Sequence, residues 1–347
     1  MNTKSIIAAL IPVVAISACM PYRTPEFFPP DNQFPGLASE QAVDVVAIHG
    51  MCTHTSNWVL ESWHQMGESL GMTYAEPSAP WWEMDEVEVW RTRLEGTSQP
   101  ISITAYAVVW SGLTTPLKTS LCYDASRDTE MCSKSATAPD RALLNSTLKT
   151  NLVNDCLSDA VLYMGTFGET IRNGMANALK AIGEDRQGNA DNLFLITESL
   201  GSKILADVLT ESGDQENLVA AVENPRAVYM AANQIPLLDL STPPGQPGVE
   251  EAIAPLSTLE QLRLRLGGDL VGAMAREIPF VLFSDPNDLL TYEFDRADLG
   301  SDTTNVRINI APTYFWLFAN PMRAHTGYLE NEKVWQQISC GKPRRCN

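Results

Sequence analysis

The sequence is poor in basic residues, in histidine and in long apolar runs. Its 347 residues include 24 lysines and arginines, 42 acidic residues and four histidines, and the net charge is -18. A chain of this charge repels phosphate backbones, and no basic and aromatic stripe offsets the repulsion locally, so we expect no nucleic-acid partner. The apolar run near the N-terminus is shorter than the about twenty residues of a membrane-spanning helix, so a membrane helix is the weaker interpretation of it.

The first residues have the pattern of a secretory signal. Lys4 precedes an apolar stretch from Ile6 to Ile16, and the small residues Ser17 and Ala18 stand directly before Cys19. The apolar stretch of roughly a dozen residues has the length of a signal peptide rather than of a membrane span.

The residues around the expected cleavage site resemble the bacterial lipobox. This resemblance implies that residues 1–18 are removed and that Cys19 becomes the lipid-bearing first residue of an envelope lipoprotein, attached to a membrane through its acyl chains. Met20, which is neither acidic nor basic, resembles the residue found in lipoproteins that proceed to the outer membrane. The proline-rich residues 19–38 are expected to tether the anchor to one folded domain over residues 39–347.

The remaining six cysteines predict disulfides, because an exported protein folds in an oxidising compartment. They are Cys52, Cys122, Cys132, Cys156, Cys340 and Cys346. Six cysteines permit fifteen complete pairings, which sequence alone does not resolve. The short separations favour Cys122 with Cys132 and Cys340 with Cys346 as local pairs.

Short apolar runs alternate with helical patterns along the chain. The expected strands are 43–48, 86–94, 101–110, 193–196, 227–230, 280–283 and 306–310, and the expected helices are 56–70, 163–182, 199–207, 259–276 and 332–338. This alternation predicts an α/β fold with a mostly parallel sheet flanked by helices. The pattern weakens over residues 111–159, where we expect a cap-like insertion with a helix from Arg141 onward.

A candidate nucleophile stands in a strand, sharp turn, helix context. Ser199 lies in Thr197-Glu198-Ser199-Leu200-Gly201, between the expected strand 193–196 and the following helix. This is the setting of a nucleophile elbow, where small flanking residues allow strand and helix to approach closely. Thr197 is bulkier than the usual glycine at its place. The alternative is a serine that only caps the helix.

A serine nucleophile needs a base, an acid partner for that base and oxyanion donors. In this type of site the acid and then the histidine follow the serine along the chain, and His325 is the only histidine after Ser199. Two aspartates compete for the acid after the strand 280–283. Asp288 has the placement of a triad acid, whereas Asp285 precedes a proline and is expected to hold the turn.

These motifs together resemble the α/β-hydrolases, nearest to bacterial lipase-like and esterase-like proteins. The resemblance covers about residues 43–338, with the exception of 111–159. It implies an oxyanion loop at His49-Gly50 after the first strand, where the amide of Met51 would act together with the amide of Leu200.

The resemblance implies a serine esterase or lipase that forms an acyl-enzyme with no metal or organic cofactor. Its substrate would be an acyl ester, with lipids among the candidates, and thioesters and amides remain open because they require the same machinery. Two alternatives remain: His49, Cys52 and His54 as metal ligands, and a non-catalytic envelope lipoprotein with the hydrolase fold as a binding or scaffold module.

Overall fold

The computed structural model of the chain describes residues 25–28, 34–96, 101–186, 192–211, 215–241, 257–267, 278–294, 303–314, 318–342 and 346. The expected signal peptide and Cys19 lie outside these ranges. None of the helices within the ranges has both the length and the apolar composition that crossing a bilayer requires.

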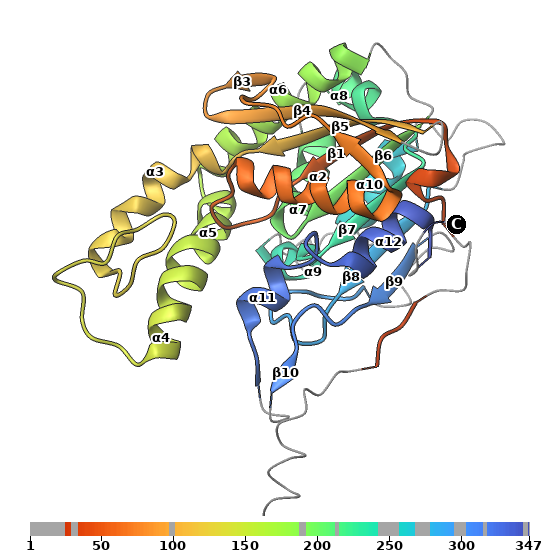
Figure 1. Cartoon of the computed structure of the whole chain (residues 1–347). Coiled ribbons are helices and arrows are strands. Elements are labelled where there is room, and N and C mark those ends of the chain that lie inside the picture. The colour runs from red at the N-terminus through yellow and green to blue at the C-terminus, as the bar shows by residue number, and fades with distance from the viewer. Residues whose placement is uncertain are drawn as a thin grey trace, which may run out of the picture.

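A nine-stranded sheet forms the centre of the molecule (Figure 1). Its strands are β1 (Ala42–Ile48), β2 (Met72–Tyr74), β3 (Trp82–Met84), β4 (Val87–Gly96), β5 (Ser102–Val109), β6 (Leu193–Glu198), β7 (Ala227–Ala231), β8 (Phe280–Ser284) and β9 (Thr303–Arg307). The order is β2-β4-β5-β1-β6-β7-β8-β9, with β3 also paired to β4. Strands β5, β1, β6, β7, β8 and β9, in this spatial order, are parallel. Strand β4 pairs with β5 in the antiparallel direction. The predicted α/β fold with a mostly parallel sheet is confirmed.

Helices cover both faces of the sheet (Figure 1). On one face lie α6 (Gly168–Arg186), α7 (Leu200–Glu211), α8 (Gln215–Val222) and α10 (Thr258–Leu266), and on the other lie α2 (Ser56–Leu70) and α12 (Glu332–Cys340). Strand β1 serves both cores because its side chains alternate between the faces, with Val46 in one core and Val45 in the other. The fully buried sequences of β6, β7 and β8 match the near-continuous apolar runs of a sheet covered on both faces.

Several element boundaries differ from the sequence expectation. The strand expected at 306–310 is β9, which ends at Arg307. The helix expected over 163–182 is divided, because α5 (Ser158–Met164) stops before α6 begins at Gly168. The helix expected to reach residue 276 is described only as far as Leu266 in α10, and residues 268–277 lie outside the described ranges.

The expected insertion is a helical projection beside the sheet (Figure 1). It contains the short helices α3 (Thr115–Lys118) and α4 (Leu143–Thr147), a π-helical segment over Leu148–Leu157, and the start of α5. Its π-helical segment carries Cys156, which forms a disulfide with Cys52 at the end of β1. The insertion is therefore covalently attached to the edge of the sheet where the candidate site lies.

Two predicted local disulfides are confirmed. Cys122 pairs with Cys132, and Cys340 pairs with Cys346. The third pair, Cys52–Cys156, joins residues 104 apart in sequence. Nothing in the local sequence predicts a pairing over that separation.

The described part of the expected tether packs against the domain. Phe34 and Leu37 are buried in the core that α2 and α12 cover, and Tyr229 donates a hydrogen bond to the Pro35 carbonyl at 2.8 Å. Phe27 forms an isolated bridge with Arg307. Packing therefore begins before residue 39, because this segment has apolar side chains that the sheet can bury.

Candidate active site

Ser199 occupies a sharp turn between the end of β6 and the start of α7. Its φ is 53°, in the left-handed region that a non-glycine residue rarely adopts. Its amide donates a hydrogen bond to the Ala231 carbonyl at 2.8 Å, which ties the turn to the end of β7. Strain of this kind persists only where the surroundings hold it, and it is common at functional sites.

Two glycines allow the elbow to approach the end of β1. A Cβ added at Gly201 would lie 2.5 Å from the His49 carbonyl oxygen, and one at Gly50 would lie 2.5 Å from the Cβ of Ser199. Real Cβ atoms do not tolerate such distances from backbone, so any side chain at either place would displace the elbow or the loop after β1. Both glycines belong to the motifs that the sequence predicts.

Thr197 is accommodated without opening the elbow. Its side chain is buried, and its hydroxyl lies 2.8 Å from the hydroxyl of Ser202 in the first turn of α7. The pairing gives each buried hydroxyl a partner. A threonine in place of the usual small residue therefore adds a contact between strand and helix.

The three predicted triad residues form a continuous hydrogen-bond chain. The Ser199 hydroxyl lies 2.9 Å from Nε2 of His325, and Nδ1 of His325 lies 2.9 and 3.0 Å from the two carboxylate oxygens of Asp288. Because both Asp288 oxygens accept, Nδ1 carries the proton and Nε2 is free to accept from Ser199. All three side chains are buried, and they come from β6–α7, from the loop after β8, and from α11 (Pro321–Thr326).

Asp288 is held as a carboxylate by its neighbours. Burial alone would raise its pKa, but hydrogen bonds from His325, Thr291 and the Leu290 amide outweigh that effect and lower the pKa below its ordinary value. Tyr328 donates a further hydrogen bond at 3.1 Å. The acid is thus fixed in orientation as well as in charge.

Asp285, the competing aspartate, binds backbone amides, and the described hydrogen bonds of the His325 ring go to Ser199, Gln234 and Asp288. One of its oxygens accepts from the amides of Ile310 at 2.7 Å and Ala311 at 2.9 Å, and the other accepts from the Asn287 amide at 2.8 Å. Asp285 therefore joins the loop after β8 to the segment after β9, in agreement with its predicted role in the turn.

The two predicted oxyanion donors lie at neighbouring strand ends. Met51 follows β1, Leu200 follows Ser199, and both residues are buried. Within the described part of the chain, neither backbone amide has a hydrogen-bond acceptor. A buried amide without an acceptor is costly unless a ligand supplies one. Both amides are therefore available to a ligand oxygen.

The histidines of the loop after β1 have partners of their own. Nδ1 of His49 lies 2.7 Å from the Gly50 carbonyl, its Nε2 accepts from the Trp110 amide at 2.9 Å, and its ring stacks on that of Trp110. Burial lowers the pKa of His49 well below its ordinary value and that of His54 to about 4, so both are neutral at pH 7. Cys52 is disulfide-bonded. His49 and Cys52 therefore have no free donor atom for a metal ion, which argues against the metal-ligand alternative.

Glu198 is a buried acid that the sequence analysis did not single out. One carboxyl oxygen accepts from the Trp58 indole at 3.3 Å, and the other has no partner among the described residues. Burial raises the pKa of Glu198 to about 8, and the negative charges of Glu330 and Asp288 add to this effect. Its position inside the elbow could have indicated that Glu198 is buried, because strand residues beside a nucleophile are buried.

The raised pKa of Glu198 predicts a stability that depends on pH. Between about pH 4.5 and pH 8 the folded state keeps the Glu198 proton and the unfolded state has lost it. The contribution of Glu198 to the free energy of unfolding is therefore greatest below about pH 4.5 and is lost as pH rises through about 8. Glu198→Gln should therefore stabilise the protein relative to the parent increasingly from pH 5 to pH 9, by on the order of a few kcal/mol at the upper end. Thermal melting at several pH values measures the difference.

The control for this experiment is Glu83→Gln, at an exposed residue of β3. Its melting temperature should differ from that of the parent by a similar amount at every pH. A constant difference for Glu198→Gln as well would contradict the raised pKa.

Gln234 is a second polar residue of the site that the sequence analysis missed. It is buried after β7, with its amide nitrogen 3.5 Å from Nε2 of His325 and 3.8 Å from the sulfur of Met51. Its carbonyl oxygen has no partner among the described residues. The available signal was its position after a strand that neighbours β6, at the edge where parallel α/β sheets bind ligands.

A cavity of about 800 Å³ lies beside the triad. His54 and Trp58 line it from the loop and helix after β1, Met322 and Thr326 line it from α11, and Asp155 lines it from the insertion. Ser199 and His325 are not part of its wall, although Thr326 directly follows His325. The insertion thus forms part of the wall of this cavity.

No protein-family model matches the chain, and no curated protein matches its sequence. A functional assignment therefore depends on the geometry of Ser199, His325 and Asp288 and on the loops around them.

Proposed function

We propose that the protein is a serine hydrolase of the α/β-hydrolase type that cleaves carboxylic esters through an acyl-enzyme. The observation that carries the proposal is the hydrogen-bond chain from the Ser199 hydroxyl through His325 to Asp288. The strained backbone at Ser199 supports it, and so do the amides of Met51 and Leu200, which have no acceptor among the described residues. A buried chain of this kind has the order and geometry of nucleophile, base and orienting acid.

In the proposed reaction, Ser199 Oγ attacks the ester carbonyl while its proton passes to Nε2 of His325. The carbonyl oxygen becomes an oxyanion between the amides of Met51 and Leu200, and Asp288 stabilises the imidazolium. His325 then gives its proton to the departing alcohol as the carbon–oxygen bond breaks.

Water completes the proposed cycle. As the oxygen of a water molecule attacks the acyl carbon, His325 takes a proton from that water. His325 then returns a proton to Ser199 as the carboxylic acid leaves. Thioesters and amides would follow the same steps with a thiol or an amine as leaving group. Parallel assays on short and long p-nitrophenyl esters, a thioester and an anilide would rank these substrates.

A fluorophosphonate probe tests the proposal, because it reacts with an activated serine. We expect the probe to label the parent on Ser199, as located by peptide mass spectrometry, and to abolish ester turnover in proportion to labelling. Ser199→Ala should not be labelled.

The matched control is Ser120→Ala, at an exposed serine of the insertion whose hydroxyl donates to the Leu117 carbonyl. It should be labelled like the parent. A folded parent that resists the probe and turns over none of the substrates would contradict the proposal and favour the scaffold alternative.

A further inference from the structure

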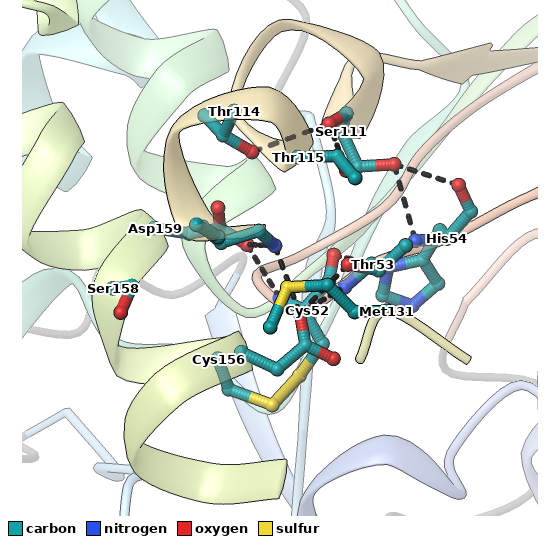
Figure 2. Close-up of polar contacts among 12 residues, drawn as sticks. Cys52, Thr53, His54, Ser111, Thr114, Thr115, Met131, Cys156, Ser158 and Asp159 are labelled. Carbon is teal, nitrogen blue, oxygen red and sulfur yellow. Dashed lines mark hydrogen bonds and ion pairs between the residues drawn. A yellow bond between two sulfur atoms is a disulfide. The ribbon is translucent and has the colours of Figure 1, made fainter. Parts of the chain in front are cut away.

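The loop that carries the Met51 amide is held by side chains of the insertion (Figure 2). Directly after Met51, the Cys52 amide donates to Asp159 Oδ2 at 2.8 Å, and the Thr53 amide donates to Asp155 Oδ1 at 2.9 Å. Asp159 and Asp155 lie one helical turn apart, so both carboxylates face the loop from the same side. The amides that follow Met51 are thus paired, while the Met51 amide has no acceptor within the described part of the chain.

The start of the insertion holds the far end of the loop in the same manner. The His54 amide donates to the Ser111 hydroxyl at 3.1 Å, and this hydroxyl donates to the His54 carbonyl at 2.6 Å (Figure 2). The preceding residue, Trp110, donates its indole N–H to the His49 carbonyl at 3.0 Å. Residues from both ends of the insertion therefore constrain the loop after Met51, and Trp110, which directly precedes the insertion, constrains it before Met51.

A buried lysine fixes the two carboxylates. Nζ of Lys118 lies 2.9 Å from Asp155 Oδ1 and 3.0 Å from Asp159 Oδ2, the same oxygens that accept from the loop amides. The side chains of Lys118 and Asp159 are both 0% exposed. Water therefore does not compete for the bond between Lys118 and Asp159, and the Asp159 carboxylate has one favourable orientation. The Asp155 side chain is 21% exposed.

The backbone of Cys52 needs such support. Its φ is 83°, outside the regions that non-glycine residues favour. The Cys52–Cys156 disulfide joins it to the π-helical segment that directly precedes α5, the helix that carries Asp159. A peptide held in a strained conformation returns to a relaxed one when its partners are removed. Asp159 holds the N–H of the Met51–Cys52 peptide. The Met51 N–H belongs to the preceding Gly50–Met51 peptide, which shares the Met51 Cα, so relaxation at Cys52 would rotate the Met51 backbone dihedrals and change the direction of the Met51 amide.

We propose that Asp159 is a positioning residue for the oxyanion site, which aims the Met51 amide through its hydrogen bond with the Cys52 amide and its ion pair with Lys118. This inference rests on the proposed function. It assigns the insertion a part in the chemical step in addition to its place in the cavity wall.

The proposed role predicts a loss confined to the transition state. Asp159→Ala should lower kcat about 10- to 100-fold with little change in KM. A misaligned amide stabilises the oxyanion of the transition state less, whereas it changes the binding of the neutral ester little. The affinity for a trifluoromethyl ketone, which forms a tetrahedral oxyanion adduct with Ser199, should fall by the same factor. Asp159→Asn, which keeps an oxygen for the Cys52 amide, should retain most of the parent kcat.

A second variant removes the risk that a buried Lys118, left with only the partly exposed Asp155 as its partner, prevents folding. The double change Lys118→Met and Asp159→Leu removes both charges of the Lys118–Asp159 pair, and replacing a buried ion pair with apolar residues is often tolerated. Asp155 keeps its charge, but its side chain is 21% exposed and still accepts from the Thr53 amide. We expect it to fold and to show the same loss of kcat and of ketone affinity. The control Arg141→Ala breaks the ion pair with Asp124 inside the insertion, away from the loop, and should leave both quantities unchanged.

These measurements are made below the melting temperature of each variant, so that a loss of folded protein is not counted as a loss of kcat. If the double variant is folded and keeps the parent kcat and ketone affinity, Asp159 is only structural and the inference is overturned. A parent without probe labelling or turnover would instead overturn the proposed function, and this inference with it. The two failures differ because the second is seen before any variant is made.

Discussion

Replacing Ser199 or His325 by alanine is expected to remove nearly all ester turnover, by about 10⁶-fold in kcat for a triad that acts as a unit. The two residues share one proton transfer across 2.9 Å. Without Ser199 the base has no nucleophile to activate, and without His325 the serine hydroxyl remains a weak nucleophile. The double variant should therefore be scarcely slower than either single variant.

Steady-state turnover on a short p-nitrophenyl ester measures all three variants. The residual rate above that of water would come from the oxyanion amides and from substrate binding. His64→Ala is the control, because His64 is exposed on α2 and precedes Ser199 in the chain. Losses that multiply in the double variant, as at independent sites, or substantial turnover in folded His325→Ala would show that the triad is misassigned.

The central sheet was predictable because its signal is local and strong. Strands β6, β7 and β8 are short apolar runs buried on both faces, and α2 has its predicted limits at Ser56 and Leu70. The edge strands β2 and β3 have no such signal. Each has only three residues, most of them partly or fully exposed, so their pairing with β4 depends on the tertiary structure and not on an apolar pattern.

The site was predictable where chain order limits the choices. With four histidines and only one after Ser199, chain order left His325 as the candidate base, and the structure brings it to the predicted serine and acid. Asp159 could not be found in this way. It is one of 42 acidic residues, and its contact with Cys52 spans 107 residues of sequence. Such a pair becomes visible only when the insertion is placed beside the sheet.

The choice between the two aspartates after β8 leads to the second large effect. Asp288→Asn should leave the fold intact but lower kcat by up to about 10⁴-fold, by analogy with the serine proteases. The amide nitrogen of asparagine donates where the carboxylate accepts, so Nδ1 of His325 would have to accept and its proton would move to Nε2. An imidazole with the proton on Nε2 cannot accept from Ser199.

Asp285→Asn should act on stability instead. Its Oδ2 accepts from two buried amides, those of Ile310 and Ala311, and an asparagine has only one oxygen to serve them and the Asn287 amide. We expect a lower melting temperature, with on the order of 1–3 kcal/mol lost for the unsatisfied amide, and far less loss of kcat in the folded protein. Turnover and melting temperature of both variants, measured side by side, separate the two roles. If Asp285→Asn lost more turnover than Asp288→Asn, the acid would be Asp285, and the 2.9 Å contact between Asp288 and His325 would not be the one that orients the base.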